Sequence, residues 1–139
     1  AEETIGMIRS QGGIAYLPHP YAAGKGGGGK YAERLGQLCD VIEVFNARLH
    51  NTSMNRKAEN LALRHGKLMG AGSDAHTIGE IGNAWVDLPV HSNEPTALLA
   101  ALEVANAGGR EASRLVHLGS AWAKVRKKFS GALAGGLVC

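Results

Sequence analysis

The stretch DVIEVFNARLHNTSMNRKAENLALRHGKLMGAGSD, residues 40–74, decides the fold of this protein. It opens with a β-branched and aromatic run at 40–46 and closes with a second apolar run at 67–74, both typical of buried strands. Between the two runs, residues 53–65 carry apolar side chains at helical spacing, and Gly66 is placed to end that helix. Two strands separated by a helix predict a parallel βαβ unit.

The alternation of strands and helices continues on both sides of this stretch. We predict further strands at 13–20 and 84–90, and further helices at 1–12, 31–38, 96–107 and 120–129. The chain has 139 residues, which is within the size of one domain and short of the roughly 250 residues of a complete βα barrel. We therefore expect an α/β fold with residues 1–139 as one domain, or a piece of one, and with 108–139 as a C-terminal helical tail.

The composition is that of an ordinary soluble globular protein. Hydrophobic residues make up 45% and charged residues 19%, and no apolar run reaches the roughly 18 residues of a membrane span. The first residues lack the basic and then apolar plan of a signal peptide. Cys39 and Cys139 are too few for a disulfide framework. We therefore expect reduced thiols, a cytoplasmic location and no contact with a membrane.

The net charge is +3, and the basic residues are spread out except for one cluster near the C-terminus. The cluster consists of Lys124, Arg126, Lys127 and Lys128. It could contact a nucleic-acid backbone, but charge patterning favours the simpler interpretation of a solvated helix face.

The sequence GKGGGGK, residues 24–30, has the spacing of a phosphate-binding P-loop. A P-loop also requires Ser or Thr next, to hold Mg²⁺, and a strand immediately before the loop. In this chain Tyr31 occupies the position where Ser or Thr is required, and residues 19–23 separate the loop from the predicted strand. The pattern therefore favours a flexible, basic lid over a nucleotide site, because consecutive glycines cost conformational entropy to order.

Polar side chains gather at the predicted carboxyl ends of the strands. His19 ends the first strand, Glu43 and Asn46 belong to the second, and Asp74 and His76 follow the third. Loops at the carboxyl ends of parallel strands converge, so we expect these groups at one rim of the sheet. Neutral imidazole and carboxylate oxygen are suitable ligands for Zn, Mn or Fe. The rim therefore predicts a divalent metal site.

Two of these residues have simpler interpretations. His19 precedes Pro20 and could be an ordinary loop residue. Asp74 could cap a short helix predicted at 77–81, which is a common task for aspartate. The residue pattern by itself leaves both alternatives open.

Three motifs together resemble a known family. The chain contains GGIAYLPHPY, CDVIEVFNAR and LMGAGSDAHTIGEIGNAWVDL. In this order and at this spacing, these segments resemble the C-terminal half of the PHP family, the polymerase and histidinol phosphatase metal-dependent phosphoesterases. The resemblance implies a distorted βα barrel that binds two or three divalent ions and hydrolyses phosphate esters. It implies that His19, Asp74 and His76 are metal ligands and that Glu43, in the IEV segment, has a supporting role.

One departure from the family pattern is large. Family members carry an N-terminal HxH motif with further ligands, and the chain contains no such motif. We therefore expect this chain to supply the C-terminal ligands of a longer enzyme and to be inactive alone. Arg48, Lys25 and Lys30 are candidates for binding the phosphate of the substrate.

The alternative is a non-catalytic PHP-like scaffold or regulatory module, associated with nucleic acid through the basic cluster near the C-terminus. In either case an incomplete barrel leaves strand edges without neighbours, so we expect self-association. The sequence does not identify the substrate beyond a phosphate ester.

Overall fold

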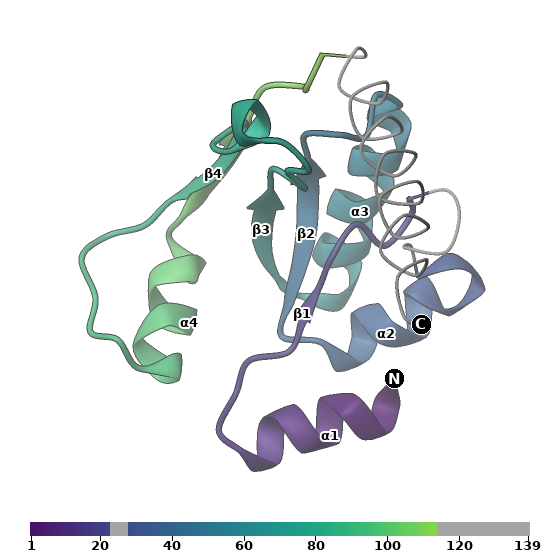
Figure 1. Cartoon of the computed structure of the whole chain (residues 1–139). Helices are drawn as coiled ribbons and strands as arrows, with labels where there is room; N and C mark the ends of the chain where they lie inside the picture. The colour runs from purple at the N-terminus through teal and green to yellow at the C-terminus, as the bar shows by residue number, and fades with distance from the viewer. Residues whose placement is uncertain (23–27, 114–139) are drawn as a thin grey trace, which may run out of the picture.

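The computed structural model describes residues 1–22 and 28–113 and contains a mixed α/β fold (Figure 1). The helices and strands, in chain order, are α1 (Glu2–Ser10), β1 (Tyr16–Leu17), the 3₁₀ helix η1 (Gly29–Tyr31), α2 (Ala32–Leu38), β2 (Val41–Asn46), α3 (Thr52–His65), β3 (Leu68–Gly72), the 3₁₀ helix η2 (Ile78–Glu80), β4 (Ala84–Asp87), α4 (Pro95–Glu103) and β5 (Asn106–Gly109). The predicted parallel α/β arrangement is confirmed for the first three strands.

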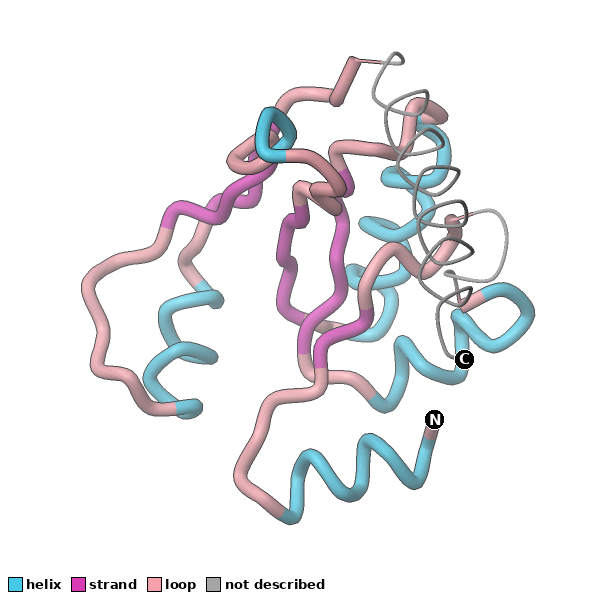
Figure 2. The backbone as a smooth tube through the Cα atoms, in the orientation of Figure 1, coloured by secondary structure: helices cyan, strands magenta, loops and turns pink. Residues whose placement is uncertain are grey.

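The centre of the fold is a three-stranded parallel sheet in the order β1-β2-β3. Val41 of β2 is paired with Tyr16 on one side and with Leu68 on the other. A register shift between Glu43 and Phe45 bends the pairing of β2 with β3. The central position of β2 places its carboxyl end between the loops that follow β1 and β3 (Figure 2).

One face of this sheet packs against helices (Figure 1). Ile42 of β2 is fully buried against Leu61 and Ala62 of α3, which occupy one side of that helix at helical spacing. The side chain of Asn51 begins α3 by accepting a hydrogen bond from the Ser53 N–H, and Gly66 ends it in the left-handed conformation. The prediction that Gly66 closes this helix is confirmed.

The opposite face of the sheet is less completely covered. An apolar cavity of about 290 Å³ lies there between the parallel strands and the segment formed by β4 and α4. Tyr16, Val41 and Gly70 line it from the sheet, and Leu98 and Leu102 line it from α4. Alternation along β2 thus directs Ile42 to the helices and Val41 to the cavity.

Two predicted strands are shorter than expected. The first was predicted over 13–20, but β1 has only Tyr16–Leu17, because Pro18 and Pro20 have no N–H to donate to a sheet. The strand predicted at 84–90 ends at Asp87, just before Leu88 and Pro89, for the same reason.

The helix predicted over 96–107 was wrong at its C-terminal end. Helix α4 ends at Glu103, and Asn106–Gly109 form β5, which pairs antiparallel with β4. Glycines favour this pairing because a Cβ at Gly108 would lie 3.3 Å from the Trp85 ring, leaving little room for a side chain. The expected helical tail at 108–139 begins within β5, and its residues from 114 onward lie outside the described part, as does the helix predicted at 120–129.

The barrel implied by the family resemblance is not confirmed. Within residues 1–22 and 28–113 the strands form one three-stranded and one two-stranded sheet, and these do not close into a barrel. In the same residues, no helix combines the length and the apolar character needed to cross a lipid bilayer.

Candidate functional site

The carboxyl ends of the three parallel strands form one rim of the sheet. His19 follows β1, Glu43 and Asn46 belong to β2, and Asp74 and His76 follow β3. The parallel pairing places all three strand ends at this rim, as predicted. The strands that precede His19 and Asp74 are not neighbours, because β2 lies between them.

The backbone is strained at two of the candidate ligands. His19 has φ of 27° and Asp74 has φ of 48°, and in the described part of the chain they are the non-glycine residues with positive φ. Such conformations cost free energy in residues with a Cβ and concentrate at functional sites. Both strained residues lie at the rim where the sequence predicts metal ligands.

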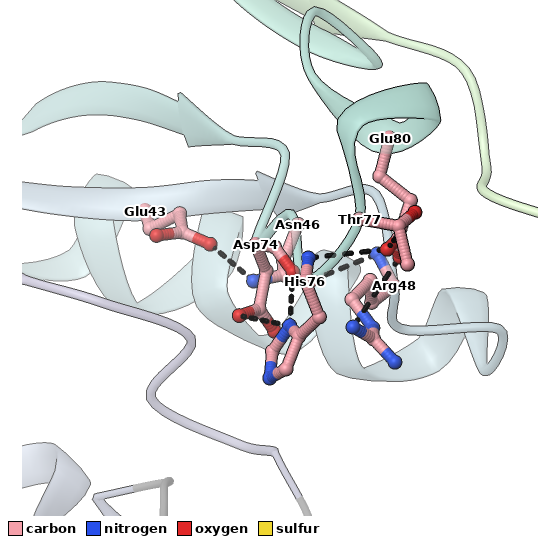
Figure 3. A network of polar contacts seen from close by, with 7 residues as sticks. All are labelled: Glu43, Asn46, Arg48, Asp74, His76, Thr77 and Glu80. Atoms are coloured by element: carbon pink, nitrogen blue, oxygen red, sulfur yellow. Dashed lines mark hydrogen bonds and ion pairs between the residues drawn. The ribbon is translucent and has the colours of Figure 1, made fainter. Parts of the chain in front are cut away.

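Glu43 is a buried carboxylate at the rim, with only 6% of its surface exposed. Its Oε1 accepts a hydrogen bond of 2.6 Å from the Asn46 side-chain amide (Figure 3). Burial raises the pKa of the Glu43 carboxyl above its usual range, against the opposing effects of Asn46 and His19 and in the same direction as the nearby Asp74. Glu43 therefore interacts electrostatically with both His19 and Asp74, and its strand lies between the two flanking strands.

Asn46 joins this carboxylate to the turn that follows β2. Its amide donates to Glu43, while its Oδ1 accepts from the Arg48 backbone N–H at 3.0 Å. Asn55 of α3 holds the Asn46 backbone in turn, accepting from its N–H at 3.0 Å and donating to its carbonyl at 3.2 Å. These bonds fix Asn46 between Glu43 and the turn that follows β2, and a supporting or substrate-binding role for Asn46 stays a prediction.

The ring of His76 is oriented by its own loop. Its Nδ1 lies 2.8 Å from the Asp74 carbonyl oxygen and 3.8 Å from Asp74 Oδ1 (Figure 3). A carbonyl only accepts hydrogen bonds, so this contact requires the hydrogen on Nδ1. In the neutral ring Nε2 then carries the lone pair, which is the arrangement that a metal-ligating histidine needs.

His19 offers a second imidazole at the rim. Its Nδ1 is buried and has no hydrogen-bond partner in the described part of the structure. Buried polar atoms are rarely left without a partner, so such an atom calls for an explanation. A bound metal ion would satisfy this nitrogen. The donor set of two imidazoles and a carboxylate fits Zn, Mn or Fe.

In this structure the three candidate ligands are not arranged around one point. No group of three or more His, Cys, Asp or Glu side chains in residues 1–22 and 28–113 is positioned to hold a metal ion. The assignment of His19, Asp74 and His76 as ligands to a divalent ion therefore stays a prediction. Asp74 does not cap η2, because the residue at that helix start is Thr77.

The candidate phosphate-binding residues differ in position. Arg48 is buried, and its Nη1 forms an ion pair of 3.3 Å with Glu80 Oε1. Lys30 lies near the surface with its Nζ 5.1 Å from the centre of the Tyr31 ring. Lys25 and the basic cluster at 124–128 lie outside the described residues.

Sequence reasoning missed Glu80, which is 1% exposed and accepts hydrogen bonds from the Thr77 hydroxyl at 2.8 Å and the His76 N–H at 3.1 Å. Burial opposes its ionisation, but these bonds and the Arg48 charge lower the pKa of the Glu80 carboxyl below its usual value. The signal was present in the sequence, because Thr77 and Glu80 have the spacing of a helix capping box.

One family model matches the part of the chain that carries two of the candidate ligands. Residues 52–106, which include Asp74 and His76, match the family model described as PHP-associated. The expected resemblance to a C-terminal PHP region is confirmed. The PHP-associated match begins at the start of α3 and ends at the start of β5, so it covers the motif loop and the segments on both sides.

An uncharacterized protein of Methanocaldococcus jannaschii is 37% identical to this chain over 90 residues. The matched region is 60% of this chain and 38% of that relative, so the chain spans well under half of the relative's length. No solved structure matches the chain.

Proposed function

We propose that this chain supplies C-terminal metal ligands to a metal-dependent phosphoesterase of the PHP type. The observation that carries the proposal is the position of the motif residues at one rim of a parallel sheet, in a chain whose residues 52–106 match the PHP-associated model. His19, Asp74 and His76 are the proposed ligands, with Zn, Mn or Fe as the ion. When bound, such ions activate a water molecule and polarise the oxygens of a phosphate ester.

Side chains and backbone groups of the rim would orient the ligands for the ion. The hydrogen bond from His76 Nδ1 to the Asp74 carbonyl presents Nε2 as the ligand atom. Glu43, fixed by Asn46, supplies a buried acidic group beside His19 and Asp74. Burial raises the pKa of this carboxyl, so Glu43 keeps its proton to a higher pH than an exposed glutamate does.

The candidates for substrate binding are the lysines rather than Arg48. The Arg48 guanidinium is buried against Glu80, and so we assign it a supporting role. Lys30 is exposed next to the segment that follows His19, and together with Lys25 it would attract the phosphate group of a substrate.

Metal titration of the 139-residue chain tests the proposal. We expect saturable, weak binding of Mn²⁺ or Zn²⁺ by isothermal titration calorimetry. Asp74→Ala and His76→Ala should each weaken it by more than about tenfold, because even the partners that orient a ligand contribute about that much. The matched control is His91→Ala, because His91 is an exposed histidine whose Nδ1 contacts the Ser92 carbonyl. Equal binding by all variants would contradict the ligand assignment.

A non-catalytic PHP-like module is the second candidate, and one observation favours it. The described residues contain no complete group of three ligands. Under this alternative the wild-type chain would bind no divalent ion, and a longer protein containing it would lack phosphoesterase activity. The same titration therefore separates the two functions.

A further inference from the structure

The loop that carries Asp74 and His76 is closed at its base by a serine. Ser73 Oγ accepts a hydrogen bond of 2.9 Å from the Ala84 N–H and donates one of 3.3 Å to the Ala84 carbonyl. Residues 74–83 therefore form a loop whose two ends are joined where β3 ends and β4 begins.

Apolar packing does not hold this loop. Ile78 and Ile81 flank the 3₁₀ turn, and they are 88% and 70% exposed. The buried residue of the turn is instead Glu80, whose exposure is 1%. A buried carboxylate is costly unless it is paired, so its contacts must account for its position.

Those contacts join the loop to the end of β2. Glu80 Oε2 accepts from the His76 N–H and from the Thr77 hydroxyl, while Oε1 faces Arg48 Nη1 at 3.3 Å (Figure 3). The Arg48 N–H donates to Asn46 Oδ1. A continuous series of polar contacts thus runs from the His76 backbone to the residue that fixes Glu43.

We propose that Glu80 is a positioning residue, which fixes the segment containing Asp74 and His76 through the hydrogen bonds that its carboxylate accepts from His76 and Thr77, beside Arg48 at the end of β2. It acts on the ligands through the backbone and does not itself touch the ion. The inference rests on the proposed function in assigning the metal to Asp74 and His76. The effect of Glu80 on the loop can be measured without metal.

Two substitutions at the same position separate positioning from the ion pair. Glu80→Gln and Glu80→Ala both remove the negative charge opposite Arg48, but only glutamine keeps a side-chain oxygen that can accept from His76 and Thr77. If the oxygen positions the loop, glutamine should restore much of what alanine loses. If only the charge matters, the two variants should behave alike.

The first readout is the rate of amide hydrogen exchange at the His76 N–H, which NMR measures in the metal-free chain. We expect a protected His76 N–H in the wild type, partial protection in Glu80→Gln and fast exchange in Glu80→Ala, because the acceptor of that N–H is lost. Thr77→Val is the milder variant to use if Glu80→Ala does not fold, since it removes only the hydroxyl contact to Glu80. It should raise the exchange rate to an intermediate value.

The second readout is the affinity for Co²⁺ and the visible absorption of bound Co²⁺, which reports ligand geometry. Glu80→Ala should weaken binding by about 10- to 100-fold and alter the spectrum, as expected for a group that orients ligands. Glu80→Gln should stay closer to the wild type. Unchanged exchange and unchanged affinity in Glu80→Ala, or equal losses in both variants, would overturn the proposal. If the wild type binds no Co²⁺, the proposed function fails, and the exchange experiment still decides whether Glu80 positions the loop.

Discussion

Two side chains of the parallel sheet are fitted closely to glycines of β3. A Cβ built on Gly72 would lie 2.8 Å from Glu43 Oε2, and one built on Gly70 would lie 2.5 Å from the Tyr16 hydroxyl oxygen. Neither distance is compatible with a real side-chain contact. Because Gly70 and Gly72 have no side chain, the Tyr16 ring and the Glu43 carboxyl can lie against β3.

Gly72→Ala tests this fit. We expect the added methyl to displace the Glu43 carboxyl and to lower the free energy of unfolding by about 1–3 kcal/mol, as overpacking does in other proteins. Urea unfolding followed by circular dichroism measures the change. Gly79→Ala is the matched control, because nothing lies within 4 Å of a Cβ built there. Equal losses in both variants would show that the space beside Glu43 is not the cause.

Helix α1 is attached to the sheet by polar contacts made at Asp40. Arg9 of α1 donates to Asp40 Oδ1 at 2.7 Å, and the Ala15 N–H donates to Oδ2 at 2.8 Å. Asp40 immediately precedes β2, so one carboxylate connects α1, the approach to β1 and the start of β2. A second ion pair, between Glu2 and Arg34, is exposed on both sides and adds little.

The Asp40 contacts predict a pH-dependent stability. Burial opposes ionisation, but the Ala15 N–H and Arg9 outweigh it and lower the pKa of the Asp40 carboxyl in the folded protein. A lowered folded-state pKa stabilises the protein above the unfolded-state value of about 3.9, and this contribution is lost as the pH falls through the folded-state value.

We expect Asp40→Asn to reduce the free energy of unfolding at pH 7 by about 1–2 kcal/mol, because it weakens hydrogen bonds to a charged group. The difference in free energy of unfolding between the variant and the wild type should shrink as the pH falls below the ordinary pKa range of aspartate. Urea titrations at a series of pH values measure it, with Glu2→Gln as the control for an exposed ion pair. A difference that stays constant down to acid pH would contradict the role of the Asp40 charge.

In residues 1–22 and 28–113, the parallel sheet has two edges without a further strand. The parallel sheet has β1 at one edge and β3 at the other, and in the described part neither hydrogen-bonds to the β4–β5 pair. Unpaired strand edges are sites for pairing with another chain. We propose that the isolated chain associates with itself through such an edge.

Sedimentation velocity over a range of protein concentrations checks this association. We expect the mean sedimentation coefficient to rise with concentration, because edge pairing between chains follows mass action. A coefficient that stays at the monomer value throughout the range would rule out the proposed association.

The isolated chain should also be a poor phosphoesterase. PHP-type chemistry uses a cluster of ions, and the described residues do not form even one complete group of three ligands. Hydrolysis of p-nitrophenyl phosphate should stay close to background with added Mn²⁺ or Zn²⁺. A longer protein that contains this chain should be active and should lose its activity on Asp74→Ala. Full activity of the 139-residue chain would contradict the proposal that further ligands are needed.

The sequence by itself determined the local elements and the position of the motif residues. The β-branched run at 40–46, the helical spacing of 53–65 and the glycine at 66 are local features of the sequence, and they predicted β2 and α3 closely. Because the strands are parallel, the same pattern placed His19, Glu43 and Asp74 at one rim. Periodicity and capping depend on contacts a few residues apart, so a sequence displays them directly.

Only the tertiary structure decided which distant residues meet. The pairing of β5 with β4 depends on the fit of Gly108 against Trp85, and a helical pattern at 96–107 does not contain that contact. The burial of Glu80 against Arg48 joins residues far apart in the chain, although the local Thr77–Glu80 spacing was visible. The free energy of such contacts comes from packing and desolvation between elements, and these exist only once the elements have come together.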